Sequence, residues 1–414
     1  MRIAYYSHYF TPEIGAPSMR LHDLSRQWLT IGHDVQVVTC FPNHPTGVLY
    51  PGYSGGLAMR ERLDGVDVLR HWTYITPNKG ILKKTLGHIT YLPSAMLLSD
   101  HRLANPNVTI GSSPTFFAAI AAAGAAARRR IPFVMEVRDL WPAIFVELGV
   151  LKDRRIIAAL ERLELALYRR ATRIVTVTEA FRRNLIERGV PEEKVATVPN
   201  GADDDFWRPQ DPPSALRAKL GLVNRCVVLY IGAHGISHGL ARILDAAETL
   251  RHRPDIQFLF VGEGAEKANL EAQARRVGLG NVRFLDSVDK AAVREFYALA
   301  DVCLVPLRDI PLFDTFIPSK MFEIMAMGRP IVASVRGEAA AILERSGAAV
   351  VTPPETSAAI AEAILRLVDR PEERRVMGER GRAFVTAHYS RRALAGNYLD
   401  ILEEAVVSYR GNRR

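Results

Sequence analysis

The chain has 414 residues, more than one ordinary hydrophobic core accommodates, so we expect two domains of about 200 residues each. An apolar fraction of 48% and a charged fraction of 24% are those of a soluble globular protein. The formal charge of +9 favours an anionic partner such as a nucleotide, a lipid phosphate or nucleic acid, although an arginine-rich genome accounts for it equally well.

Cysteine usage and hydropathy bear on the compartment. Cys40, Cys226 and Cys303 lie in apolar, strand-like runs without metal-ligand spacing, so we expect buried free thiols in a reducing cytoplasm. The sequence opens directly on a strand-like run, without the pattern of a signal peptide. The longest alanine-rich run, FFAAIAAAGAAARRR, is too short and too weakly apolar to span a bilayer. These features predict a cytoplasmic protein that is neither secreted nor membrane-spanning.

The first half of the chain alternates strand-like and helix-like segments. A Gly/Pro loop and a helix at residues 18–32 follow the first strand, and an alanine-rich helix comes later. The apolar runs are short, β-branched and nearly continuous, as in parallel strands that are buried on both faces. Strands are expected at residues 2–10, 33–41, 107–113, 132–139 and 173–181.

The rhythm breaks at residues 195–221, which are rich in Pro, Gly and Asp and which we interpret as an interdomain linker. It then restarts, with strands expected at residues 226–235, 256–264, 281–288, 301–307 and 330–335. The pattern predicts an α/β protein of two tandem Rossmann-like, doubly wound domains that face a central cleft, with ligands at the carboxyl ends of the strands. We place the domains at residues 1–200 and 201–389, and expect a helix at 390–414 to pack back on the first domain.

The strongest local signal is the stretch PLFDTFIPSKMFEIMAMGRPIVAS, residues 311–334. Pro318 suits the first turn of a helix that ends at Gly328. Glu323 then lies about one turn into the helix, where its carboxylate could accept two hydrogen bonds from a ribose. Alternatively, Glu323 only complements the helix dipole, which is worth about 0.3–1 kcal/mol.

Two cations stand near predicted helix starts. Lys320 lies in the first turn of the helix just described, where a cation opposes the dipole but would help the backbone N–H groups to hold a phosphate. A solvated surface lysine is the alternative. Near the N-terminus, Gly15 in a loop and Arg20 in the first turn of the next helix predict a second anion site, unless ordinary turn chemistry explains them.

A glycine-rich turn, YIGAHGISHGL, follows the first strand of the second half. Gly232, Gly235 and Gly239 resemble a phosphate-cradling turn, although not a Walker loop or a dinucleotide fingerprint. His234 and His238 could hydrogen-bond to a diphosphate. Because no third ligand is nearby in sequence, a metal site is the less favoured interpretation.

Arg138, Asp139 and Trp141 come together where a predicted strand ends, which is where a parallel sheet places functional groups. An ordinary buried ion pair is the alternative. The acidic run at residues 203–205 could suggest a divalent metal, but it adjoins Asn-Gly, so we interpret it as a solvated turn.

The segment from Lys79 to Leu92 carries Lys83 and Lys84 beside regularly spaced leucines and an isoleucine. A basic amphipathic helix of this kind suits an anionic membrane surface, such as the inner face of the plasma membrane. An internal helix with a basic, solvated face is the alternative.

With these positions placed, the chain resembles the family-4 retaining glycosyltransferases of the GT-B fold over essentially its full length. The resemblance is carried by residues 18–39, 175–207, 260–271 and 322–334. It implies an acceptor-binding first domain and a donor-binding second domain. Glu323 matches the second glutamate of the family's Glu-x7-Glu motif, which grips the donor ribose, whereas Thr315 stands in place of the first glutamate.

Further departures resemble a subgroup of bacterial surface-polysaccharide transferases, including those that move acetamido-deoxysugars of the fucosamine type. The Arg and Lys of the family's glycine turn are matched here by Ala233 and His238, and Arg138 replaces the usual histidine of the first domain. In that subgroup Lys320 takes over neutralisation of the diphosphate. The residue patterns and the resemblance together predict donor-binding residues Glu323, Ser319, Lys320, His238, His234, Gly232, Thr315 and Leu285, catalytic residues Asp139, Arg138 and Lys320, and an acceptor or phosphate loop with Gly15, Arg20 and Trp141.

The expected function is transfer of a sugar, with retention, from a nucleotide diphosphate donor to a surface-polysaccharide or polyprenyl-diphosphate-linked acceptor. A UDP-sugar, including an N-acetylated aminosugar, is the expected donor, with no metal, cofactor or nucleic acid required. A GT-B nucleotide-sugar 2-epimerase and a catalytically degenerate, membrane-associated scaffold are the alternatives.

Overall fold

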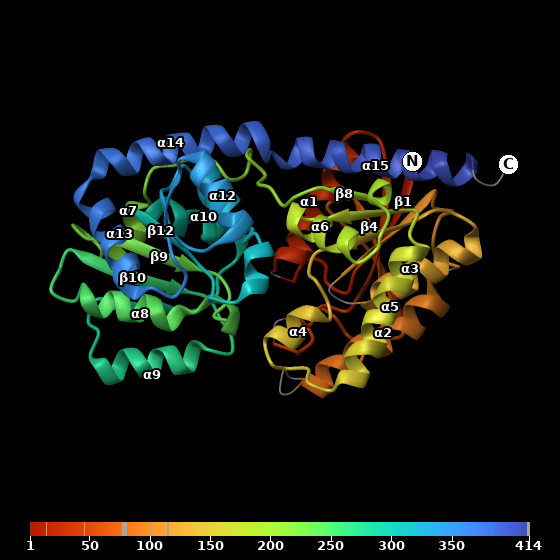
Figure 1. The fold of residues 1–414 in the computed structure, drawn as a ribbon, viewed down its shortest axis with the longest axis horizontal. Helices are drawn as coiled ribbons and strands as arrows, with labels where there is room; N and C mark the ends of the chain where they lie inside the picture. The colour runs from red at the N-terminus through yellow and green to blue at the C-terminus, as the bar shows by residue number, and fades with distance from the viewer. Residues whose placement is uncertain (14, 45, 77–80, 100, 114–115, 412–414) are drawn as a thin grey trace. The chain divides into compact units, whose positions relative to one another are not determined.

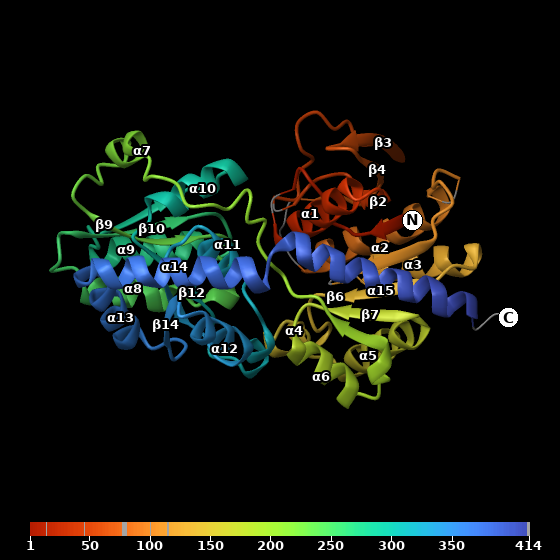
Figure 2. The same cartoon turned by 90° about the horizontal axis from the view of Figure 1, so that it is seen from above.

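The computed structural model describes residues 1–13, 15–44, 46–76, 81–99, 101–113 and 116–411, with residues 81–85 described by their backbone alone. The chain divides into two compact units, Met1–Pro199 with Arg391–Arg414, and Asn200–Ser390. Each unit contains a largely or wholly parallel sheet between helices (Figures 1 and 2). The predicted fold class, two Rossmann-like α/β domains, is confirmed.

The sheet of the first unit has the strand order β3-β4-β2-β1-β5-β6-β7-β8, and its neighbouring strands are parallel except for the β3–β4 hairpin. Strands such as β5 are buried along their whole length because helices cover both faces. The strands are β1 (Arg2–Tyr6), β2 (Asp34–Cys40), β3 (Ala58–Leu63), β4 (Val66–His71), β5 (Val108–Ser112), β6 (Phe133–Val137), β7 (Arg173–Thr176) and β8 (Val195–Thr197).

One face of this sheet is covered by α1 and by α15, the last helix of the chain (Figure 2). Trp28 of α1 donates from Nε1 to the Ala395 carbonyl of α15 at 2.9 Å, and its ring meets that of Tyr398 edge-on. The other face carries α2, α3 and α5. The helices are α1 (Ala16–Thr30), α2 (Ile81–Leu98), α3 (Phe116–Arg129), α4 (Ala143–Glu147), α5 (Arg154–Arg170), α6 (Glu179–Glu187) and α15 (Arg391–Gly411), with a 3-10 turn, η1 (Glu192–Lys194).

The sheet of the second unit has the order β11-β10-β9-β12-β13-β14, the doubly wound order of a Rossmann domain, and is entirely parallel. Its strands are β9 (Cys226–Ile231), β10 (Ile256–Val261), β11 (Val282–Leu285), β12 (Val302–Pro306), β13 (Ile331–Ser334) and β14 (Ala349–Thr352). Its helices are α7 (Ser214–Lys219), α8 (Leu240–Thr249), α9 (Lys267–Val277), α10 (Lys290–Leu299), α11 (Lys320–Ala326), α12 (Gly337–Ser346), α13 (Ser357–Asp369) and α14 (Pro371–His388), with η2 (Ile236–His238) and η3 (Pro311–Thr315).

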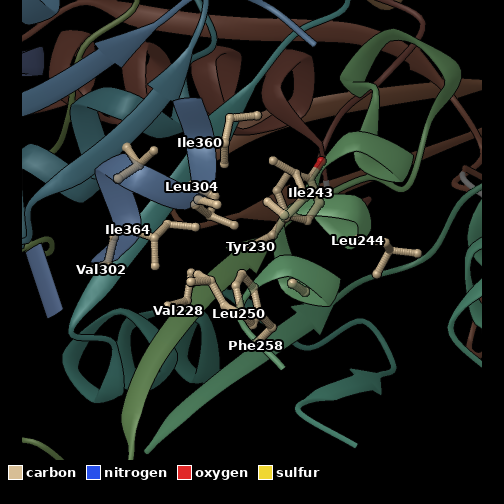
Figure 3. Packing of buried hydrophobic residues seen from close by; sticks show 14 of the residues in the cluster. Val228, Tyr230, Ile243, Leu244, Leu250, Phe258, Val302, Leu304, Ile360 and Ile364 are labelled. Atoms are coloured by element: carbon tan, nitrogen blue, oxygen red, sulfur yellow. The ribbon is translucent and has the colours of Figure 1, made fainter. Parts of the chain in front are cut away.

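The core of the second unit joins the sheet to α8, α9 and α13. Val228 and Tyr230 of β9 pack with Ile243 of α8 and Ile364 of α13, and all four side chains are buried (Figure 3). This packing holds the end of β9, and therefore the turn after it, in place.

Several local expectations need correction. Residues 195–221 are not a continuous linker, because β8 pairs with β7 in the first sheet and α7 forms a short helix in the second unit. The hairpin β3–β4 and strand β14 were not expected. Helix α11 begins at Lys320, so Pro318 precedes it instead of lying in its first turn.

The predicted thiols are free, and Cys40 and Cys303 are buried, whereas Cys226 is only partly buried. Among the helices that the structure describes, none has the combination of length and hydropathy that crossing a membrane requires.

Candidate functional site

The glycine turn of the second unit closes on Lys320. At the end of β9 the chain turns at Gly232 with φ +138°, and a Cβ built there would stand 2.6 Å from Lys320 Nζ. Glycine is therefore required both by the backbone conformation and by the approach of the lysine. Turn and lysine are 88 positions apart in sequence, yet they form one site.

Lys320 is not a solvated surface lysine. Its Nζ donates to the Ile231 carbonyl at 2.9 Å and lies 4.0 Å from the centre of the Tyr230 ring. Burial lowers the pKa of Lys320 to about 8, although the nearby Glu323 carboxylate opposes this shift. The ammonium is thus poorly solvated and short of anionic partners, which suits it to bind an oxyanion.

The two histidines of the turn differ in accessibility. Burial, together with the Lys320 charge, lowers the pKa of His238 to about 3, so its imidazole is neutral at physiological pH. His234 is fully buried, lies near Phe260 and Phe284, and has no hydrogen-bond partner for either ring nitrogen within the described ranges. His234 is therefore enclosed by aromatic side chains, whereas His238 lies on the partly exposed side of the turn.

Glu323 lies one turn into α11, as expected. Tyr297, which is buried on α10, donates its hydroxyl to Glu323 Oε2 at 3.3 Å. Burial and the Glu323 charge raise the pKa of Tyr297 well above its usual value, so the tyrosine remains a donor. The partly buried carboxylate is thereby oriented on a rigid helix.

Three other predicted donor residues surround α11 or the neighbouring turns. Thr315, the last residue of η3, donates to the Leu312 carbonyl at 2.6 Å. Ser319 directly precedes α11 and makes no capping bond with its side chain. Leu285 ends β11, and its carbonyl accepts the Gly262 N–H at 3.1 Å. Its main chain is therefore already engaged in the fold.

Sequence reasoning missed how the neighbouring glycine turn supports this site. A Cβ on Gly262 would stand 2.0 Å from the Gly232 carbonyl oxygen, and one on Gly264 would stand 2.4 Å from that of His234. The turns after β9 and β10 therefore touch backbone to backbone. The signal was present in the sequence Gly262-Glu263-Gly264 at the end of a predicted strand, but only the paired strands reveal what those glycines face.

In the first unit, the centre of the polar network is Glu136, which was not singled out. This fully buried carboxylate on β6 accepts hydrogen bonds from the hydroxyls of Tyr5 and Ser112 and from Arg20 Nε at 3.0 Å. These partners lower its pKa despite burial, with Arg20 the main cause. Its place inside a predicted strand, two residues before Arg138, could have identified it.

The predicted phosphate role of Arg20 is not supported by its position. Arg20 is the fifth residue of α1, beyond the first turn, and only 4% of it is exposed. Besides pairing with Glu136, it donates to the carbonyls of Val198 and Pro199 at 2.9 Å each. Gly15 precedes α1 in an extended conformation with only ordinary contacts, so nothing local demands a glycine there.

Arg138, Asp139 and Trp141 do come together after β6. Burial raises the pKa of Asp139 to about 6, whereas Arg138 acts in the opposite direction. Arg138 Nε is buried and has no partner among the described residues. Trp141 packs on Phe116 with ring centres 4.3 Å apart. A carboxylate, a guanidinium and an aromatic face are thus grouped at the carboxyl edge of the sheet, as predicted.

A second group at this edge was overlooked. His8 follows β1, is buried, and has ring centres 4.5 Å from His88 and 5.2 Å from Tyr9. Tyr9 in turn lies 5.0 Å from the ring of His44 and 3.2 Å, from hydroxyl to Nε2, from His88. The run YYSHYF ends one predicted strand and FPNHP begins at the last residue of the next, so the rule used for Arg138 would have found them.

Within the described ranges, no group of three or more His, Cys, Asp or Glu side chains is arranged to hold a metal ion. In the acidic run, Asp203 accepts the Phe206 N–H at 3.2 Å and Asp204 accepts from the Ser390 hydroxyl, which confirms a turn. Of the basic segment, Lys79 lies outside the described residues, and Lys83 and Lys84 belong to the part described by backbone alone.

Two family models match the chain in succession. The model described as "Glycosyl transferase 4-like domain" matches residues 15–201, and the one described as "Glycosyl transferases group 1" matches residues 225–370. The two matches therefore correspond to successive parts of the chain, with the candidate turn and α11 in the second.

The chain is also similar to individual proteins. It is 28% identical over 393 residues to the putative colanic acid biosynthesis glycosyl transferase WcaI of Escherichia coli, covering 92% of this chain and 95% of that protein. It is 29% identical over 200 residues to the D-rhamnosyltransferase WbpZ of Pseudomonas aeruginosa, covering 46% and 48%.

Solved structures share its fold. A sucrose-phosphate synthase from Thermosynechococcus elongatus superposes with a TM-score of 0.75 at 19% identity, covering 98% of this chain and 99% of that one. HepE of Anabaena in complex with UDP-glucose gives 0.73 at 17% identity, covering 98% and 100%.

Proposed function

Because the chain belongs to the group 1, family-4 glycosyltransferases with the GT-B fold, we propose that it transfers a sugar from a UDP-sugar to a surface-polysaccharide or lipid-linked acceptor. The family is retaining, so the anomeric configuration of the donor is kept. An N-acetylated aminosugar is our choice for the sugar. The relatives named for colanic acid and D-rhamnose transfer support a role in polysaccharide assembly.

The observation that carries the proposal is the meeting of Lys320 with the Gly232 turn. Negative charge develops on the diphosphate as the bond to the sugar breaks, and a preorganised cation in a poorly solvated site stabilises that charge. Lys320 supplies such a cation, with Nζ held by the Ile231 carbonyl. His238, whose imidazole is neutral, would donate a hydrogen bond to a phosphate oxygen.

Donor recognition is assigned to groups around α11. The Glu323 carboxylate, oriented by Tyr297, would accept hydrogen bonds from the ribose hydroxyls. Ser319 would donate its hydroxyl, which makes no capping bond, to a phosphate. Thr315 would face the donor sugar in place of a carboxylate, which makes that contact uncharged.

In the first unit, Asp139 and Arg138 are proposed to orient the acceptor hydroxyl or the departing phosphate. With a pKa of about 6, Asp139 is mostly ionised at neutral pH and can accept a hydrogen bond from a hydroxyl. Trp141, which packs on the buried Phe116, offers an aromatic ring beside it.

The test is a thermal-shift screen of the purified protein against UDP, GDP, ADP, dTDP and CMP, each with and without magnesium. A ligand that binds only the folded state raises the Tm by mass action. We expect stabilisation by UDP, independent of magnesium, and its loss in Glu323→Ala. Stabilisation by another nucleotide would overturn the choice of UDP, and no shift with any nucleotide would contradict the assignment of the donor site.

We further propose that α2 docks on an anionic membrane surface. Its outward side chains include Leu86 (45% exposed), Ile89 (44%) and Leu97 (71%), spaced along one helix face. Trp72, which is 42% exposed, lies beside α2, because its carbonyl accepts a hydrogen bond from Ser94. In the sequence, Lys79, Lys83 and Lys84 stand at the start of this segment.

We therefore expect sedimentation with vesicles that contain anionic lipid, and weaker binding as salt rises. The double substitution Leu86→Ser/Ile89→Ser should reduce the bound fraction severalfold because it removes apolar area from the interface. Ile156→Ser, at another exposed isoleucine of the same unit, is the control. Equal vesicle binding by both variants, or none by the wild type, would contradict docking through α2.

A further inference from the structure

A pocket of about 330 Å³ lies at the amino-terminal edge of the second unit's sheet. Asp301, which lines it, directly precedes β12, and Arg329 directly precedes Pro330 and β13. The Gly232 turn follows the carboxyl end of β9, so the pocket and the candidate donor site are at opposite ends of the parallel strands. The pocket is therefore separate from the site already described.

Three of the arginines that line this pocket are held by main-chain carbonyls. Arg374 Nη1 donates to two carbonyls in the last turn of α13, at 2.7 and 2.8 Å. Arg382 Nη1 donates to the carbonyl of Ala326, the last residue of α11, and to that of Trp207 at 3.0 Å. Arg329 Nη2 donates to the carbonyl of Ala298, near the end of α10, at 2.7 Å. In the part of the chain that the structure describes, none of the three forms an ion pair with a carboxylate.

These contacts leave specific donors unused. In Arg374 and Arg382 only Nη1 is engaged, so Nε and Nη2, the pair that holds an oxyanion side-on, have no protein partner in the described ranges. The Nε of Arg329 is buried and equally without a partner there. A buried guanidinium nitrogen without an acceptor is unfavourable unless water or a ligand satisfies it.

The charges around the pocket do not cancel. Arg375, also at the lining, pairs with Glu372 and Glu379, and Asp301 pairs with Arg217 at 3.5 Å. The C-terminus of a helix carries roughly half a negative charge. The ends of α10, α11 and α13 therefore balance only about half of the positive charge of Arg329, Arg374 and Arg382. The pocket therefore keeps a net positive charge.

We propose that this pocket binds a small phosphate-bearing anion, gripped by the side-on forks of Arg374 and Arg382 with Arg329 as a third donor. Planar guanidinium forks match phosphate oxygens in pairs, which lysines do not. The volume is at the lower end of the range of small-molecule sites, about 300–1,000 Å³, which suits a pyrophosphate or a phosphorylated sugar. The inference does not rest on the proposed transferase function.

The probe for the test is inorganic pyrophosphate, titrated calorimetrically at low ionic strength into the full-length chain. A Lys320→Met background reduces binding at the Gly232 turn, so that the heat reports on the arginine pocket. We expect Arg382→Lys, which keeps the charge but loses the fork, to weaken binding about tenfold. Arg375→Lys is the matched control and should change the Kd by less than about twofold, because its guanidinium is already paired.

Crystals grown with tungstate locate the anion without any substitution. Anomalous density beside Arg374 and Arg382 would support the proposal, and it remains decisive if Arg382→Lys proves unstable. Equal pyrophosphate affinity in Arg382→Lys and Arg375→Lys, or tungstate bound only elsewhere, would overturn it. The three arginines would then serve solely to cap helices.

Discussion

Lys320 carries its charge where burial opposes it. The folded pKa of about 8 lies below the ordinary 10.5, so the folded state disfavours the protonated form. The corresponding penalty on stability is absent above pH 10.5 and grows as pH falls towards 8, below which it is complete. The fold thus keeps a destabilising cation, which is typical of a site built to receive an anion.

At this scale we predict that Lys320→Met weakens UDP binding by about 10- to 100-fold at pH 7, the usual loss for a charged hydrogen bond. In the wild type the affinity should fall as pH rises above 8, because the free lysine loses its proton. The variant should lack this fall. Calorimetry at pH 7 and 9 measures both effects.

The control for that substitution is Lys290→Met. Lys290 also lies over an aromatic ring of the second unit, with Nζ 4.6 Å from the Phe206 centre. It should bind UDP as the wild type does, with the same dependence on pH. A fall in affinity that persists unchanged in Lys320→Met would show that another group titrates.

Gly232 and Gly235 make a matched pair for a second prediction. Gly232→Ala places a methyl group against Lys320 Nζ in a strained conformation, which should cost about 1–3 kcal/mol of unfolding free energy and displace the lysine. Gly235 has φ −101° and no neighbour closer than 3.8 Å to an added Cβ, so Gly235→Ala should be tolerated. Urea unfolding and UDP titration distinguish them, and equal behaviour would contradict this account of the turn.

At the scale of elements, strand β6 joins α1 to the first sheet through a buried charge. Arg20 of α1 and Glu136 of β6 are exposed by only 4% and 0%, and they meet at 3.0 Å. The same Arg20 guanidinium also donates to the carbonyls of Val198 and Pro199. The pair is therefore a junction between elements that are far apart in sequence.

Glu136→Gln should destabilise the first unit by about 3–5 kcal/mol, since it removes the carboxylate that pairs with the buried Arg20 guanidinium. Glu192→Gln removes one partner of an exposed pair with Arg182 and should cost no more than about 1 kcal/mol. Urea unfolding followed by circular dichroism measures both. Similar midpoints would show that the Arg20–Glu136 pair contributes little to stability.

At the scale of the whole molecule, the last helix of the chain, α15, packs in the first unit and not in the second unit that precedes it in sequence. Helix α15 covers the face that α1 shares, and Arg391 pairs with the buried Asp23. Removing residues 391–414 would expose that face and remove the Arg391 partner of Asp23. The first unit would then lose the cover of its sheet while the second retains its own core.

We predict that this truncation lowers amide protection in α1 and β1 but not in α8 and β9, as measured by hydrogen–deuterium exchange. A shorter truncation of residues 409–414, beyond the buried positions of α15, should leave both units protected. Loss of protection throughout the chain would instead show that the units unfold together.

Much of this architecture follows from local sequence. Hydrophobic periodicity and Gly/Pro punctuation depend on neighbouring residues, and they predicted the alternating strands and helices, the turn at Gly232 and the position of Glu323 one turn into its helix. The edge strand β3 escaped because its partly exposed, alternating residues look unlike the buried parallel strands, and β8 because it has only three residues.

Only tertiary structure decided which of these polar groups meet. Lys320 approaches Gly232 and Ile231 because β9 and β12 are neighbours in the sheet. Arg20 pairs with Glu136, which lies 116 positions away in the sequence. The arginine pocket likewise gathers residues from α14 and from the starts of β12 and β13. Such contacts are selected by the packing of whole elements against one another, a long-range energy that no window of neighbouring residues contains.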